Sequence, residues 1–128
     1  MFIPFMWHKE SEPWETVPAP AGLTLHVGTA LTNEGGTLQI AAGADKPTHI
    51  CMEEVEETED GQKVHAERVR METIYETELS AASADIAAGA KYTIDATGEK
   101  LTATTGENAE VVSFDGTEAG DKVRVRFS

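Results

Sequence analysis

Short stretches of alternating apolar and polar residues recur along this chain, and glycine, proline, asparagine or aspartate bounds most of them. Such alternation is typical of strands that bury one face. The clearest case is residues 89–104, where two strands, 91–94 and 100–104, flank a turn at 95–98. Thr, Tyr and Ile in these strands favour a pleated, half-buried surface, and Gly98 suits the turn. The stretch is therefore predicted to be a β-hairpin.

The same design occurs earlier, at residues 28–40, with its turn at 33–36. Further strands are expected at the following places: 23–27, 48–52, 110–114 and 122–127. The pattern predicts an all-β fold, a small barrel or sandwich of short antiparallel strands. At most one short helix is expected, near residues 80–88, where Ser80 would cap a helical turn. The alternative for these residues is a loop that packs Ile86 into the core.

Residues 62–79 allow two interpretations. Apolar residues alternate over 64–66 and again over 69–71, but on opposite parity. A β-bulge near 67–68 would reconcile the two runs and give two strands, 62–70 and 72–79. A helix is the competing interpretation, because five residues fall at helical spacing, although one is an arginine: Val64, Arg68, Met71, Tyr75 and Leu79. The content of Val, Ile, Thr and Tyr favours the strands.

Four prolines lie within residues 1–20, so this segment is expected to be an extended N-terminal arm that precedes a β domain at 21–128. The apolar start lacks a basic region before it, which argues against a secretory signal. Large apolar side chains on an extended arm must be buried somewhere. The arm either folds back over its own core or docks on a neighbouring subunit. In the second case the contact residues are Phe2, Ile3, Phe5, Met6, Trp7 and Trp14.

The composition limits the classes of function. The 128 residues suffice for one domain. Their formal net charge of −13 repels nucleic acid phosphates, which argues against direct binding of DNA or RNA. A protein that mimics DNA stays possible. A partner with a basic surface is favoured instead. No apolar run is long enough to span a membrane. Cys51 is the single cysteine, so no intrachain disulfide can form, which fits a reducing compartment.

No stretch carries a catalytic motif, and neither catalytic nor cofactor-binding residues are expected. His49 and Cys51 would point the same way on a strand, but they supply at most half of a zinc site. A buried structural histidine and a core thiol are the favoured interpretations. Residues 53–60 hold six acids in eight positions and predict a solvated loop. A calcium site there lacks the ligand order and the glycine of an EF-hand, so no metal site is predicted.

The last strand, 122–127, places Val123, Val125 and Phe127 on one face and basic residues on the other. This is the only basic strip in an acidic chain. Its outer face either pairs with acids on neighbouring strands or contacts an acidic surface, such as the next subunit. Arg124 and Arg126 are the candidates for that subunit contact.

Four phrases together resemble the capsid decoration (cement) proteins of tailed phages, namely GLTLHVGTALTNEGGTLQIAAGADKPTHICM, ETIYETELS, IAAGAKYTIDATGEKLTATT and AEVVSFDGTEAGDKVRVRF. They fall within residues 22–127. The resemblance rests on a G-x-x-L…G-x-L opening, a P-x-x-I strand and a G-D-x-V-x-V-x-F ending, which are glycine and strand patterns rather than catalytic motifs.

The resemblance implies a compact β domain without enzymatic activity. It also implies a homo-oligomer, most often a homotrimer, that is made in the bacterial cytoplasm and stabilises the head from the virion capsid surface. The implied partners are other copies of the chain and the major capsid protein, with an extended arm that reaches across the shell. The alternatives are another head–tail or tail accessory protein and a β module that binds a metal or a carbohydrate.

Overall fold

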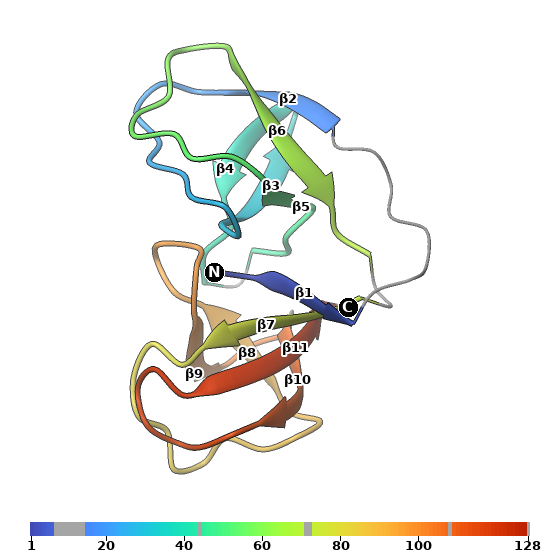
Figure 1. Cartoon of the computed structure of the whole chain (residues 1–128), viewed down its shortest axis with the longest axis vertical. Coiled ribbons are helices and arrows are strands. Elements are labelled where there is room, and N and C mark those ends of the chain that lie inside the picture. The colour runs from blue at the N-terminus through green and yellow to red at the C-terminus, as the bar shows by residue number, and fades with distance from the viewer. Residues whose placement is uncertain (7–14, 44, 71–72, 108, 128) are drawn as a thin grey trace.

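Two antiparallel sheets, one above the other in Figure 1, hold the strands of this protein. The structure is a computed structural model that describes residues 1–6, 15–43, 45–70, 73–107 and 109–127, without the side chains of residues 4–6 and 103. Over these residues the chain forms eleven strands and no helix: β1 (Ile3–Met6), β2 (Glu15–Ala19), β3 (Ala30–Glu34), β4 (Thr37–Ile40), β5 (His49–Cys51), β6 (Gln62–Arg68), β7 (Ile74–Glu78), β8 (Lys91–Ile94), β9 (Leu101–Thr105), β10 (Ala109–Phe114) and β11 (Lys122–Phe127). The expected all-β fold of short antiparallel strands is confirmed.

Each sheet curls around its own apolar core. The five-stranded sheet has the order β2-β6-β5-β3-β4 and encloses a cluster that includes Leu25, Leu31 and Val64. The six-stranded sheet has the order β1-β7-β11-β10-β8-β9 and encloses a cluster rich in residues of β8, β10 and β11. A bridge between Leu79 and Leu101 brings the end of β7 to the start of β9. Each sheet of short strands therefore encloses a small core and leaves few strand edges exposed.

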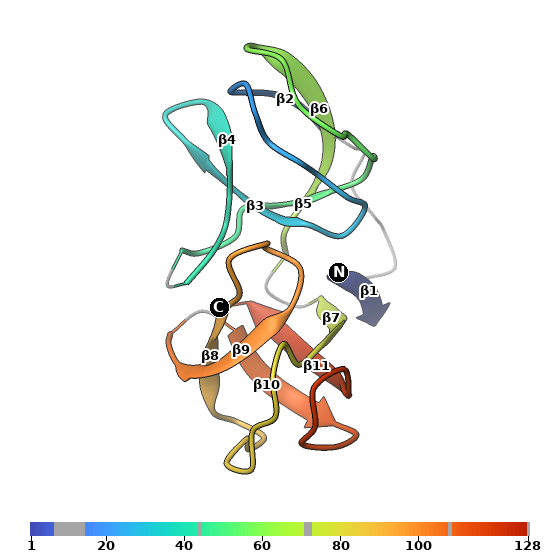
Figure 2. The same cartoon turned by 90° about the vertical axis from the view of Figure 1, so that its left-hand side faces the viewer.

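The two sheets are packed together through β3 and β5. All three residues of β5 are buried, and Ile50 belongs to the core of the six-stranded sheet while Cys51 belongs to that of the five-stranded sheet. The β8–β9 turn reaches toward the five-stranded sheet, as Figure 2 shows, and the Ala30 nitrogen donates to the Gly98 oxygen at 2.7 Å. The two sheets thus share buried residues and main-chain hydrogen bonds.

Both predicted hairpins are present. β3 and β4 pair across Gly35 and Gly36, whose φ angles of 62° and 90° are those of a two-residue turn that glycine adopts without strain. β8 and β9 pair in the second hairpin, where Gly98 has a φ angle of 75°. The alternation of apolar and polar residues therefore predicts both pairs correctly.

Of the other expectations for local structure, one strand was wrong, and two segments adopt one of the alternatives left open. Residues 23–27 form no strand; only Leu25 makes an isolated bridge, with Val55. Residues 80–88 form no helical turn and instead pack Ile86 into the core, which was the alternative. The two strands favoured for residues 62–79 are confirmed as β6 and β7, and the competing helical interpretation fails.

The bulge expected near residues 67–68 is absent, and β6 pairs with β5 in regular register up to Arg68. The change of parity that suggested a bulge has a different cause. The chain leaves the five-stranded sheet after β6 and joins the six-stranded sheet at β7. Val64 and Ala66 accordingly belong to the core of the five-stranded sheet, whereas Val69 packs against that of the six-stranded sheet. A change of sheet and a β-bulge both change the parity of the apolar residues, so the sequence pattern does not distinguish them.

Candidate interaction surface

Phe2 packs within its own chain. Its side chain is fully buried, and its ring centroid lies 5.2 Å from that of Phe127, which in turn lies 5.4 Å from the ring of Tyr75. The Phe2 nitrogen donates to the Gly28 oxygen at 2.7 Å, and β1 pairs with β7. Aromatic contacts at this separation stabilise a core. Phe2 is therefore a core residue here.

The other residues proposed for the arm fall into three groups. Ile3 is 52% exposed on the outer side of β1. Phe5 and Met6 lie in β1, but their side chains are outside the described set, and Trp7 and Trp14 lie outside the described residues altogether. Residues 15–19 form β2 and pair with β6. For the two tryptophans, docking on a neighbouring subunit stays a prediction.

Arg124 lies at the centre of a network of charged residues on the outer face of the six-stranded sheet. Its guanidinium contacts Glu76 at 3.2 Å on β7 and Asp115 at 2.9 Å after β10, and it donates to Ser113. The hydrogen bonds from Arg124 lower the pKa of Asp115, and Asp115 in turn raises the pKa of Arg124. The Arg124 side chain is only 16% exposed.

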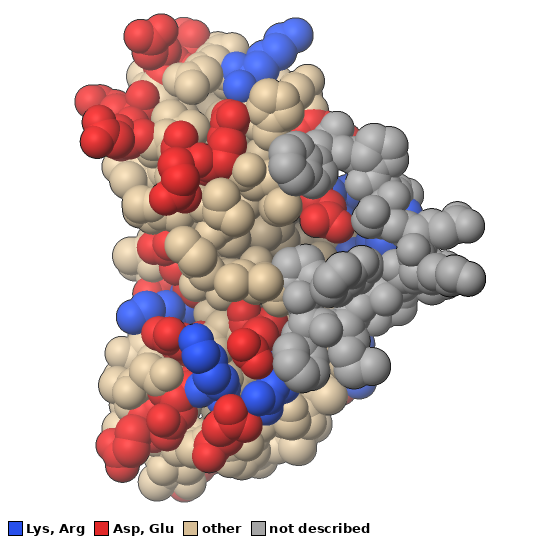
Figure 3. Space-filling model, in the orientation of Figure 1, with Lys and Arg blue, Asp and Glu red and all other residues tan. Residues whose placement is uncertain are grey.

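The neighbouring basic residues of β11 behave in the same way. Arg126 contacts Glu110 at 2.9 Å, and Lys122 contacts Glu78 at 3.0 Å. The strip thus pairs with acids of the adjacent strands, which was the first of its two interpretations. Figure 3 shows lysines and arginines of this region lying among acidic side chains. A contact between Arg124 or Arg126 and another subunit stays a prediction.

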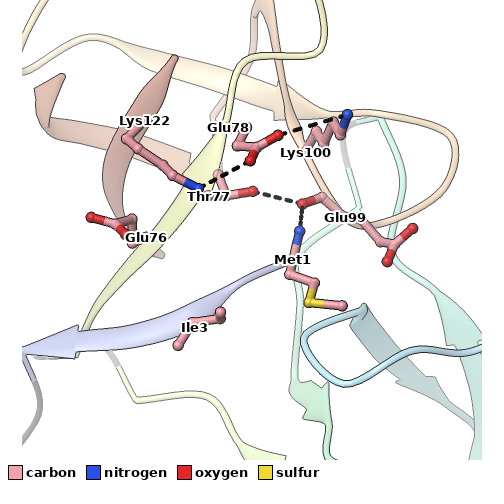
Figure 4. A pocket seen from close by; sticks show the side chains of 8 residues that line it. All are labelled: Met1, Ile3, Glu76, Thr77, Glu78, Glu99, Lys100 and Lys122. Carbon is pink, nitrogen blue, oxygen red and sulfur yellow. Dashed lines mark hydrogen bonds and ion pairs between the residues drawn. The ribbon is translucent and has the colours of Figure 1, made fainter. Parts of the chain in front are cut away.

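A hollow of about 260 Å³ lies beside β1, lined by residues of β7 and β11 and by the β8–β9 turn (Figure 4). Met1 and Ile3 form its apolar part, and Lys122 and Lys100 both reach Glu78 across it, at 3.0 and 3.8 Å. The Glu99 oxygen accepts hydrogen bonds from the Met1 nitrogen and, at 2.6 Å, from the Thr77 hydroxyl. Glu99 thereby links the start of β1 to β7.

Two more hollows continue from this one. The second, of about 330 Å³, shares Glu99 with the first and is also lined by Leu23, Thr24, His26 and Ile40. The third, of about 370 Å³, shares Thr24 and His26 with the second and ends at Glu54, Val55 and Glu56. We call this row of three hollows the waist groove. Its lining residues lie far apart in the sequence, so the alternating pattern gave no signal for the groove. Among its lining residues, sequence reasoning singled out Ile3 and the acidic segment 53–60, but it did not predict that they lie along one groove.

The acidic segment at 53–60 is more firmly held than a solvated loop. Leu25 and Val55 exchange main-chain hydrogen bonds of 2.9 Å, and the buried Thr58 hydroxyl donates to the Pro20 oxygen. Glu54 accepts hydrogen bonds from the Val27 nitrogen and from His26, and these lower the pKa of Glu54 and raise that of His26. Val55 and Thr58 attach the segment to the 22–27 loop, although its carboxylates stay exposed.

His49 and Cys51 are both buried in β5. The His49 Nδ1 atom lies 2.9 Å from the Thr48 hydroxyl, and its Nε2 atom lies 3.5 Å from a Glu15 oxygen that Arg68 also holds. The Cys51 thiol donates to the Glu53 oxygen at 3.1 Å, and burial raises its pKa. A raised pKa disfavours the reactive thiolate, so Cys51 acts as a core residue, as predicted.

Within the described ranges, no three residues among histidines, cysteines and acids are grouped so that they could hold a metal ion. The same part of the chain contains no helix that could cross a membrane.

Comparison with known proteins finds a solved structure with a similar fold. No family model matches the chain, and no curated protein matches its sequence. Among solved structures, the crystal structure of the N base of head fiber gp8.5 in bacteriophage phi29 matches with a TM-score of 0.55 over 91% of this chain and 93% of that chain. The two chains share a fold. Their sequence identity is 13%, so the likeness concerns the arrangement of strands.

Proposed function

We propose that this chain is a structural protein of a tailed-phage virion that binds the outer surface of the head as a capsid decoration protein. The observation that carries the proposal is the fold shared with the N base of a phage head fiber over nearly the full length of both chains. The glycine and strand patterns at residues 22–127, which resemble decoration proteins, support it independently.

The physical character of the surface fits this role. Decoration needs many modest contacts repeated over a lattice, and several copies joined in one oligomer multiply weak contacts without new chemistry. A net charge of −13 keeps such a protein soluble before assembly and favours a basic surface on its partner. We infer a homo-oligomer, with a trimer favoured, made in the bacterial cytoplasm and bound to the major capsid protein. The role requires no cofactor.

A second candidate is the base of a fiber that projects from the head. The matched structure is itself described as a fiber base, which favours this version. A base needs a further segment or protein that forms the shaft, whereas a decoration protein acts alone. Both versions place the chain outside the head shell.

The experiment uses heads purified from a phage whose gene for this chain carries a stop codon. Purified chain is added to these heads, which are then sedimented and heated until they release DNA. Co-sedimentation with a higher temperature of release supports decoration. Binding without any gain in stability favours the fiber base, and the absence of binding contradicts the proposal. Light scattering of the purified chain tests the trimer.

A further inference from the structure

We propose that the waist groove takes an extended segment of the head-shell protein that carries both apolar and basic side chains. This inference rests on the proposed function and names the surface through which it acts. The juxtaposition of an apolar patch at β1 with Glu56 and Glu99, which have no ion-pair partner among the described residues, carries the inference.

The apolar patch is concentrated at one place. Among the described residues, the large apolar side chains that stand exposed are Met1, Ile3 and Val27, at 41%, 52% and 37%. Met1 and Ile3 line the first hollow. Val27 follows His26, which lines the second and third hollows, and a β carbon on Gly28 would lie 2.8 Å from that of Met1. Exposed apolar side chains that gather in this way mark an interaction site.

The charges in the groove favour a basic occupant. Lys100 and Lys122 are both engaged by Glu78. Glu56 and Glu99 line the groove, and within the described part of the chain neither carboxylate has an ion-pair partner. A basic side chain placed there gains an ion pair, and the net charge of −13 attracts it from a distance.

The shape of the groove favours an extended segment over a compact one. Three hollows lie in a row and share Glu99 at one junction and Thr24 and His26 at the next. A row of separate hollows suits successive side chains of one extended strand. A second copy of this chain is disfavoured at this groove because it would bring its own excess of acids to an acidic rim.

The test measures binding of purified variants to heads that lack the chain. Ile3→Glu and Val27→Glu place a charge on the apolar patch, and Glu56→Lys and Glu99→Lys reverse the charge of the rim. Matched controls are Ala84→Glu and Asp85→Lys, which make the same changes on the exposed loop after β7. All six positions have exposed or half-buried side chains, and circular dichroism confirms the fold of each variant.

We expect each groove variant to weaken binding about tenfold or more, and each control to bind within about twofold of the wild type. Wild-type affinity in the groove variants would show that the groove is not the binding surface, while leaving the proposed function intact. Absence of binding by the wild type would overturn the proposed function instead. A photo-reactive residue at position 27 should cross-link a Lys- or Arg-containing peptide of the shell protein; a cross-link to a second copy of this chain would contradict the proposal.

Discussion

The ring of Phe2 lies 5.2 Å from the ring of Phe127, so the segment that leads into β1 packs against β11, the last strand. Both side chains are almost fully buried, and the Phe2 nitrogen also bonds to Gly28 in the segment before β3. The start of the chain therefore contacts both sheets. It contributes to the stability of the single chain, whatever residues 7–14 contact.

Phe2→Ala should destabilise the protein by about 3–5 kcal/mol, because it removes a large ring from a filled core and leaves a cavity. Urea unfolding followed by circular dichroism measures this change. The control is Ile3→Ala at the next residue, where the side chain is half exposed and the expected loss is below about 1 kcal/mol. Equal losses for the two variants would show that Phe2 is not a core residue.

Gly98→Ala should destabilise the contact between the sheets. Gly98 has a φ angle of 75°, and a β carbon there would lie 2.7 Å from the Ile40 Cγ2 atom and 3.0 Å from the Ala30 oxygen. Gly120→Ala is the control, because Gly120 has a similar φ angle of 88° but open space around it.

The control should lose about 1–2 kcal/mol from backbone strain alone, and Gly98→Ala should lose about 1–3 kcal/mol more from overpacking. Thermal unfolding of both variants measures the difference. If the two losses are the same, the β8–β9 turn does not pack against the five-stranded sheet as closely as described.

Much of the local structure could be predicted from the sequence, since strands with one buried face alternate apolar and polar residues. The hairpins at β3–β4 and β8–β9 follow from this pattern and from glycines at their turns. The division into two sheets could not be predicted, because it depends on pairings between distant segments. The same cause explains the false bulge near Arg68 and the false strand at 23–27, whose Leu25 and Leu23 face a core without joining a sheet.

Arg124→Ala should lower the free energy of unfolding by about 1–2 kcal/mol, since it removes a donor from the partly buried Glu76 on β7 and Ser113 on β10. Arg126→Ala is the matched control on the same strand. Its side chain is 45% exposed, and an exposed pair of this kind contributes less than about 1 kcal/mol. Urea unfolding at low and high salt distinguishes the two, and a larger loss for Arg126→Ala would contradict the network around Arg124.

The pair formed by His26 and Glu54 should appear in a titration. The hydrogen bond between them raises the pKa of His26 above its usual 6.5 and lowers the pKa of Glu54 below its usual 4.5. The contribution of the pair to stability is therefore fully present between about pH 4.5 and pH 6.5. That contribution is lost as the pH rises through the folded pKa of His26, and it is also lost as the pH falls through the folded pKa of Glu54. In an NMR titration, Glu54→Gln should lower the pKa of His26 toward 6.5. An unchanged pKa in this variant would show that Glu54 does not hold the ring.

The candidate site was the harder part to foresee. Residues such as Ile3 and Trp14 are conspicuous in a sequence because they are large and apolar on a proline-rich segment. The waist groove joins His26, Glu56 and Glu99, which are unremarkable until the fold brings them together. Phe2 has the same apolar character as Ile3, yet Phe2, just before β1, is buried, and Ile3, its first residue, is exposed.

The most direct test of the central claim is mass spectrometry of purified virions of the phage that encodes this chain, combined with gold-labelled antibodies in electron microscopy. The account predicts peptides of the chain in intact virions and label over the outer surface of heads. It also predicts that heads made without the gene carry no label. Absence of the chain from purified virions, or label confined to the tail, would contradict the account.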